Sequence, residues 1–177
     1  MSPETKENPM REIKIEKLIL SCGGVKEDLD RYYKLISTIS GMKPIKKQTV
    51  RRIPGFGIRP KMEVGCMVTI RSGKAEELLA RLLSAVENQL KKKQIADNHF
   101  SFGIEEYINI PGEKYDREIG MAGLKVTIVF ARKGKRVARK KIKKGKIAPK
   151  QIVPKQEIIK FMEENFETEF YWTNDTK

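Results

Sequence analysis

Residues 41–71 of the chain read GMKPIKKQTVRRIPGFGIRPKMEVGCMVTIR. From position 62 to position 70 the even positions are apolar, which is the two-residue period of a strand with one buried face. The preceding segment 54–60 holds two prolines and two glycines, a composition typical of a loop. The stretch therefore predicts a hairpin with a long basic arm. Its exposed tip suggests a contact surface, although Phe56 fits a core position equally well.

Apolar spacing on both sides of this hairpin predicts the rest of the fold. Helical spacing marks the segments 25–40, 74–92 and 155–166. Strand patterns mark 11–22, 100–110 and 124–131, and the continuous apolar run of the last segment predicts a central strand. The resulting order, β-α-β-β-α-β-β-α, predicts an α+β fold. We expect a two-layer sandwich in which helices cover one face of a mostly antiparallel sheet, with two basic loops added.

The length of 177 residues and the hydrophobic content of 39% favour one globular domain. We expect this domain to span residues 10–170. Residues 1–9 are polar and lack periodicity, so they are expected to form a flexible tail, with a second tail at 171–177. Because no run of 18 apolar residues occurs, we expect neither a membrane span nor a secretory signal, and we expect the protein inside the cell.

The net charge of +14 is concentrated in two segments. Residues 43–61 carry seven Lys and Arg, residues 132–150 carry eleven, and neither segment has an acidic residue. Such concentration indicates a polyanion bound at a defined surface, with nucleic acid as the first candidate. On its own the segment 132–153 should be flexible and extended, kept apart by self-repulsion, and should become ordered on its partner.

Lysine and arginine side chains neutralise phosphates and release counterions, so the two basic segments supply the candidate RNA contacts. These candidates are Lys43, Lys46, Lys47, Arg51, Arg52, Arg132, Lys133, Arg136, Arg139, Lys140, Lys141, Lys143 and Lys144. Phe56 is the only aromatic residue in the two segments. Recognition of the shape and backbone of a folded RNA is therefore favoured over stacking on single strands.

Two other classes of function are weighed against RNA binding. A nucleic-acid-modifying enzyme would use carboxylates such as Glu105 or Asp116 to hold a metal ion. The single histidine, His99, excludes a His-dependent triad and a two-His metal site. A protein that binds acidic membranes would use residues 132–150, but this run lacks the apolar face of an interfacial helix.

The two cysteines, Cys22 and Cys66, do not approach the spacing of metal ligands. Both fall on predicted strands, so we expect small buried groups in a reducing compartment. The sequence therefore predicts no metal site and no cofactor.

Short motifs occur in order along the chain. They are MREI at 10–13, SG at 40–41, KP at 43–44, GF at 55–56, IR at 58–59, GC at 65–66, VT at 68–69, KAEE at 74–77, FGI at 102–104 and KYD at 114–116. In type and spacing these motifs resemble the universal large-subunit ribosomal protein family called L-five in bacteria and L-eleven in eukaryotes. The match covers about Met10 to Phe166. Its continuation past the sheet into a basic segment and a last helix is similar to the eukaryotic and archaeal branch.

The resemblance implies a non-catalytic constituent of the large ribosomal subunit that supports translation and subunit assembly. It implies binding of 5S rRNA and large-subunit rRNA in the central protuberance, beside another 5S-binding ribosomal protein. The implied 5S contact lies on an exposed sheet face, onto which Lys43, Thr69 and Arg71 map. The implied location is the cytoplasmic ribosome, with a nuclear or nucleolar assembly stage in a eukaryote, and no homo-oligomer is expected.

The resemblance also implies that the loop 53–61 contacts the peptidyl-site tRNA. The residues that carry this implied contact are Phe56, Gly57, Ile58 and Arg59.

Overall fold

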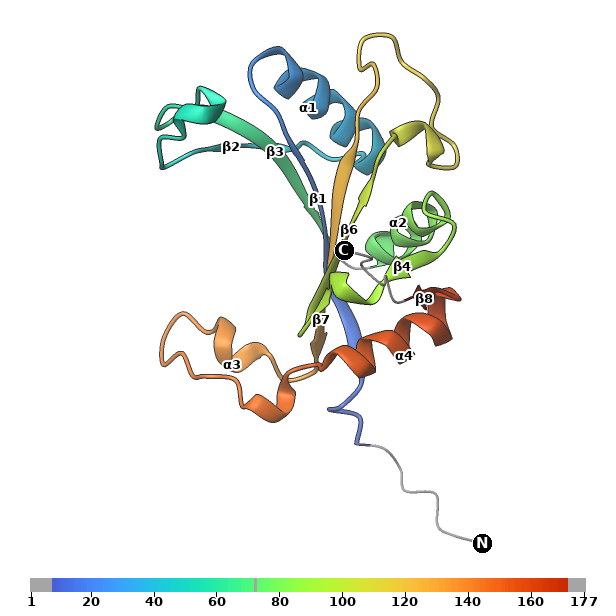
Figure 1. Ribbon diagram of the computed structural model, residues 1–177. Helices are drawn as coiled ribbons and strands as arrows, with labels where there is room; N and C mark the ends of the chain where they lie inside the picture. The colour runs from blue at the N-terminus through green and yellow to red at the C-terminus, as the bar shows by residue number, and fades with distance from the viewer. Residues whose placement is uncertain (1–7, 72, 172–177) are drawn as a thin grey trace, which may run out of the picture.

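The computed structural model describes residues 8–71 and 73–171, and within them one six-stranded sheet organises the chain (Figure 1). The strand order is β2-β3-β1-β7-β6-β5, and every neighbouring pair is antiparallel. These strands are β1 (Ile13–Gly23), β2 (Ile45–Gln48), β3 (Glu63–Ile70), β5 (Ile95–Ala96), β6 (His99–Ile104) and β7 (Leu124–Arg132). A second, two-stranded sheet pairs β4 (Gln89–Lys91) in parallel with β8 (Glu169–Tyr171). The α-helices are α1 (Glu27–Ser40), α2 (Gly73–Ser84), α3 (Arg136–Arg139) and α4 (Lys155–Phe166).

One face of the six-stranded sheet packs against α1, α2 and α4, which lie on the same side of it (Figure 1). Alternate residues of β1 and β7 supply this face, and Leu18, Leu20, Val126 and Ile128 are fully buried there. The apolar residues that recur every second position in the strands therefore pack against those that recur every 3.6 positions in the helices, and together they form one apolar layer. The predicted α+β sandwich is confirmed, and the predicted central strand, β7, lies between β1 and β6.

The opposite face of the sheet is not covered by these three helices, and we call it the open face. The strand register places Thr69 opposite Ile19, Ile19 opposite Thr127, and Thr127 opposite Ser101. The hydroxyl of Thr127 donates a hydrogen bond to that of Ser101 at 3.2 Å. Small hydroxyl-bearing side chains of β3, β7 and β6 thus lie in one row on this face, with Ile19 of β1 between the first two.

Two predicted elements end earlier than the sequence pattern indicated. The helix predicted over 74–92 stops at Ser84, because Glu87 and Asn88 adopt left-handed backbone angles and the chain then enters β4. There the buried Leu90 lies opposite Phe170 of β8. Pairing with a distant segment has overridden the local helical spacing.

The strand predicted over 100–110 ends at Ile104 and is followed by a 3₁₀ turn, η3 (Tyr107–Asn109). Tyr107 is buried, and its hydroxyl accepts a hydrogen bond from the backbone N–H of Asp116 at 2.8 Å. This hydrogen bond satisfies the buried hydroxyl and joins η3, which lies outside the sheet, to the segment that leads into β7.

The other boundaries agree closely with the sequence. The last helix spans Lys155–Phe166 as predicted. Helix α1 ends at Ser40, and the next residue, Gly41, takes the left-handed conformation of a helix C-cap with φ of 61°. Of the two predicted tails, residues 1–7 and 172–177 lie outside the described residues, while Tyr171 belongs to β8.

Phe130 is among the largest side chains of this core. It is fully buried, its ring centroid lies 5.9 Å from that of Phe100, and it meets Phe161 of α4 edge to face at 5.7 Å. We expect Phe130→Ala to lower the free energy of unfolding by about 3–5 kcal/mol, as measured by urea denaturation. Phe56→Ala removes the same atoms from a side chain that is 78% exposed, so it should change stability little. Equal losses in the two variants would contradict this description of the core.

Candidate nucleic-acid interface

The loop between β2 and β3, residues 49–62, forms a closed projection that we call the first arm (Figure 1). Its base is held by backbone hydrogen bonds between Thr49 and both Lys61 and Met62, at 2.8 and 2.9 Å. At its tip Ile53 and Ile58 form an isolated β-bridge across the 3₁₀ turn η1 (Pro54–Phe56). The short prolyl turn and the bridge give the tip a defined shape despite its loop composition.

The side chains of the first arm point mostly into solvent. Phe56 is 78% exposed and Val50 is 90% exposed, so Phe56 is not a core residue. Arg51, Arg52 and Arg59 are exposed as well. Apolar side chains with this exposure on a basic projection indicate a surface that another molecule covers.

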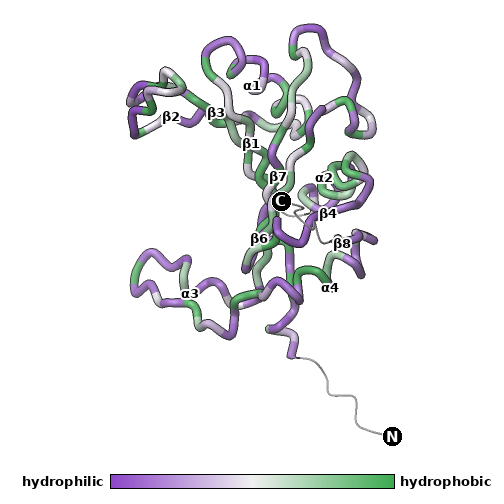
Figure 2. Tube along the Cα trace, viewed as in Figure 1, coloured by the Kyte–Doolittle hydropathy of each residue, from purple (hydrophilic) through white to green (hydrophobic). Residues whose placement is uncertain are grey.

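The chain between β7 and α4, residues 133–152, forms a second projection, which we call the second arm (Figures 1 and 2). It contains the single turn of α3 and a 3₁₀ turn, η4 (Pro149–Gln151). The expectation of a wholly extended segment is therefore wrong at these two turns. Both arms are largely hydrophilic, and both extend away from α2 and α4, to the left in Figures 1 and 2.

Arg132 closes the base of the second arm instead of facing solvent. Its side chain is only 8% exposed, and its guanidinium donates to the backbone carbonyl of Lys150 at 3.2 Å and pairs with Glu157 of α4. One side chain thereby joins both ends of the arm to the helical layer. Arg132 was nominated as an RNA contact, but this position gives it a structural role.

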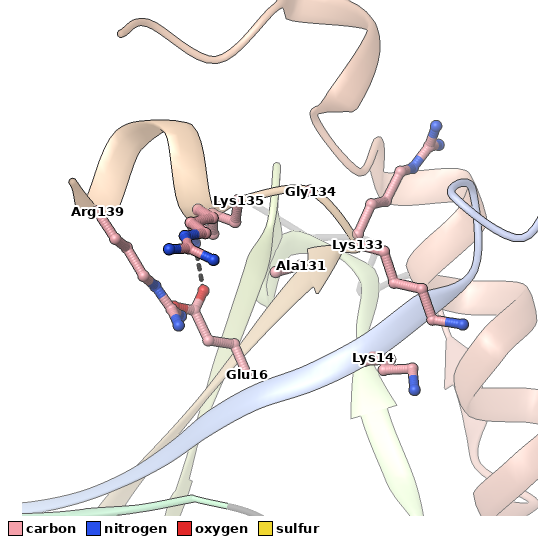
Figure 3. Close-up of a pocket in the computed structure, with 9 residues that line it drawn as sticks. Lys14, Glu16, Ala131, Lys133, Gly134, Lys135 and Arg139 are labelled. Atoms are coloured by element: carbon pink, nitrogen blue, oxygen red, sulfur yellow. Dashed lines mark hydrogen bonds and ion pairs between the residues drawn. The ribbon is translucent and has the colours of Figure 1, made fainter. Parts of the chain in front are cut away.

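Three further cations near the base pair with carboxylates of the β1 segment. Lys133 pairs with Glu12, while Lys135 and Arg139 both pair with Glu16 (Figure 3). Glu16 and the three cations line a pocket of about 510 Å³, together with Lys14, Ala131, Arg132, Gly134 and Arg136. Burial alone would raise the pKa of Glu16, but the hydrogen bonds from its two partners outweigh it, so the pKa lies below the ordinary 4.5.

The cations at the tip of the second arm differ from those at its base. In the described part of the chain, the side chains of Lys140, Lys141, Lys143 and Lys144 form no ion pair and are exposed. Ile142, between them, is 77% exposed. The tip therefore presents uncompensated positive charge to solvent.

The predicted contacts at the start of the hairpin separate onto two faces. Lys46 lies opposite Cys66, on the helical side, where its ammonium is 2.8 Å from Asp30 and 5.8 Å from the centre of the Tyr33 ring. Its pKa is raised, chiefly by the hydrogen bond to Asp30. Lys47 lies opposite Gly65, with the parity of the open face. Lys43, like Lys47, is exposed.

Residue parity identifies one open-face side chain, Lys125, that sequence reasoning did not nominate. Lys125 is exposed and lies opposite Ser21, in line with Met67 on the far side of β1. Thr69 has the same outward parity and is half-buried, and the exposed Arg71 follows it two residues later. Lys125 lies between the buried Leu124 and Val126, so the strand period alone predicts that its side chain faces away from the core. The strand order is needed to show which side chains lie beside it.

The structure also places the carboxylates and the cysteines that the sequence analysis weighed. Glu105 and Asp116 are both exposed, and among residues 8–71 and 73–171 no group of three His, Cys, Asp or Glu could hold a metal ion. Cys22 and Cys66 are buried cross-strand neighbours, and burial, with Cys66 adding to it, raises the pKa of Cys22 to about 12. None of the helices described is both long and apolar enough to cross a bilayer.

The second arm should respond to acid through Glu16. Because its folded pKa is depressed, the ion pairs are fully formed above the ordinary pKa of 4.5 and are lost as the pH falls through the folded value. We expect the backbone amide NMR signals of residues 134–139 to shift only below about pH 4.5. The shift should be absent in Glu16→Gln and kept in Glu12→Gln. A shift centred above pH 5, or one that persists in Glu16→Gln, would contradict this assignment.

Comparison with known proteins agrees with this geometry. The family model for the C-terminus of the ribosomal L5 family matches residues 63–149. The large ribosomal subunit protein uL5 of Nanoarchaeum equitans is 42% identical over 161 residues, which cover 89% of this chain and 95% of that protein. The uL5 proteins of Sulfurisphaera tokodaii and Methanobrevibacter smithii are 39% and 34% identical, covering 90% and 92% of this chain and 92% and 98% of their own lengths. The chain therefore belongs to the uL5 family of ribosomal proteins, in its archaeal-like branch.

Proposed function

We propose that the open face and the two arms bind rRNA together, with 5S rRNA on the open face and large-subunit rRNA along the arms. Family membership makes the chain a structural constituent of the large ribosomal subunit rather than an enzyme. We further propose that the chain binds these RNAs in the central protuberance, beside another 5S-binding ribosomal protein. We propose that the chain acts there as a single copy on cytoplasmic ribosomes.

The separation of the two sides of the molecule is the observation that carries this proposal. On one side α1, α2 and α4 bury the apolar face of the sheet. Away from that layer extend the two arms, which together hold fourteen Lys and Arg and no acidic residue. Phosphate neutralisation would relieve the repulsion among these cations and release counterions.

The chemistry of the open face suits folded RNA. Its small hydroxyl-bearing residues, Ser21, Thr69, Thr127 and Ser101, can donate and accept hydrogen bonds at ribose 2′-hydroxyls and phosphates. Lys125 adds a positive charge in the same area. Aromatic rings for stacking unpaired bases are not among these side chains. Recognition of an A-form backbone and its shape therefore fits better than recognition of a single strand.

Two substitutions on the open face should weaken 5S rRNA binding. We expect Arg71→Ala with Lys125→Ala to reduce affinity by about tenfold or more and to lower the slope of log affinity against log salt by about 2, because two phosphate contacts are lost. Filter binding or fluorescence anisotropy at several salt concentrations would measure both quantities.

The matched control carries Lys155→Ala with Lys160→Ala, which removes the same charge from exposed positions on α4. This control and Arg59→Ala should retain nearly full affinity for 5S rRNA. If the open-face variant and the α4 control lost affinity equally, the loss would reflect net charge alone, and the assignment of the open face would be wrong. If the unaltered protein preferred 5S rRNA no more than an unrelated folded RNA of equal length, the proposal itself would fail.

We propose a second contact, between the tip of the first arm and the peptidyl-site tRNA. The support is the exposure of Phe56 beside the exposed Arg59, on a tip held by the bridge between Ile53 and Ile58. Because the tip is already ordered, it can place an apolar ring and a cation against a tRNA surface without changing its conformation.

Phe56→Ala with Arg59→Ala should therefore weaken tRNA binding to the peptidyl site by severalfold while the protein still enters the subunit. Reconstituted ribosomes with filter-bound tRNA would measure the binding, and the protein content of gradient-purified subunits would measure entry. Val50→Ala, another highly exposed apolar position of the first arm, serves as the control. Unchanged tRNA binding in subunits that contain the double variant would refute this contact.

A further inference from the structure

Glu16 lies at an irregularity in strand β1. Ile15 pairs with Phe130 and Lys17 with Val129, so Glu16 is an extra residue in β1 with no partner on β7. A β-bulge of this kind re-aims a side chain and is a common device beside functional sites. Here it directs a carboxylate toward the second arm, where Lys135 and Arg139 meet it from two sides (Figure 3).

The Glu16 carboxylate is more enclosed than the other acidic groups that hold the arm. Its side chain is 14% exposed, against 51% for Glu12 and 43% for Glu157. It also bridges Lys135, the N-cap residue of α3, and Arg139, the last residue of α3, whereas Glu157 holds Arg132 at the base. Within the described residues, Glu16 is thus the acidic group that fixes α3 to the sheet.

We propose that Glu16 is a positioning residue for RNA binding. By holding Lys135 and Arg139 it fixes the base of the second arm, so that the uncompensated lysines at 140–144 project in one direction. The inference rests on the proposed RNA-binding role of that arm. It assigns to an acidic residue a favourable part in binding a polyanion.

Simple electrostatics predicts the opposite sign. Removing one negative charge from a basic surface should strengthen its attraction for phosphates. An arm without Glu16, however, keeps its repelling cations and loses the contact that orders α3, so RNA must order the arm when it binds. That ordering cost lowers affinity. The sign of the change therefore separates positioning from a bulk charge effect.

The test compares Glu16→Gln with Glu12→Gln, which remove the same charge from positions four residues apart. The probe is protein-free large-subunit rRNA of an archaeal relative, and affinity is measured at fixed salt. We expect Glu16→Gln to bind about fivefold more weakly, and Glu12→Gln to bind as well as the unaltered protein or better, since Lys133 is released. If Glu16→Gln bound equally or more tightly, the inference would be overturned.

A double-variant cycle tells the positioning role from a general loss of structure. In a background where Lys140, Lys141, Lys143 and Lys144 are all changed to Ser, Glu16→Gln should have no further effect on affinity, because the oriented charges are gone. Hydrogen exchange should speed up at residues 134–148 in Glu16→Gln and stay unchanged in β7. A full additional loss in the Ser background, or faster exchange throughout the sheet, would overturn the positioning role.

The same cycle keeps the two proposals apart. If the four Ser substitutions alone left affinity for the rRNA intact, the RNA-binding role of the arm would be wrong, and the inference on Glu16 would fall with it. If they weakened binding while Glu16→Gln did not, the arm would bind RNA without Glu16 as its positioning residue.

Discussion

The pairing of β1 along both of its edges is the constraint on which the structure depends. Leu18 and Leu20 lie opposite buried residues of β3 on one edge and of β7 on the other. A slip of one residue on either edge would turn these leucines to solvent and press Lys17 into the core. The double register therefore fixes both faces at once: the apolar face that the helices cover, and the open face that we propose binds rRNA.

Strong, local periodicity made much of the fold predictable, and non-local pairing limited the rest. The helix at 155–166 and the strand at 124–131 carry their patterns within one segment, so their positions followed from spacing alone. Residues 85–92 continue a helical pattern, yet they enter β4 because β8 pairs with it from the far end of the chain. Nothing in the sequence of residues 85–92 predicts that they pair with β8.

The candidate site was predictable in its charge and not in its pairing. Counting Lys and Arg located both arms, but it could not show that Lys46 meets Asp30 or that Arg132 is buried against Glu157. Those carboxylates lie sixteen and twenty-five residues away in the chain. Lys125 was not predicted, because a single lysine between buried residues does not stand out in the sequence. Only the strand order shows that it lies on the open face beside Ser21.

The distribution of charge explains how a chain with a net charge of +14 keeps a stable body. Body carboxylates such as Glu16 and Glu157 neutralise cations where the second arm leaves the sheet, in partly buried positions where an unpaired charge would be costly. Farther out, the lysines at 140–144 stand in water, whose high dielectric and salt weaken their repulsion. The apolar layer holds the fold, and the lysines at 140–144 are the cations that we propose rRNA phosphates neutralise.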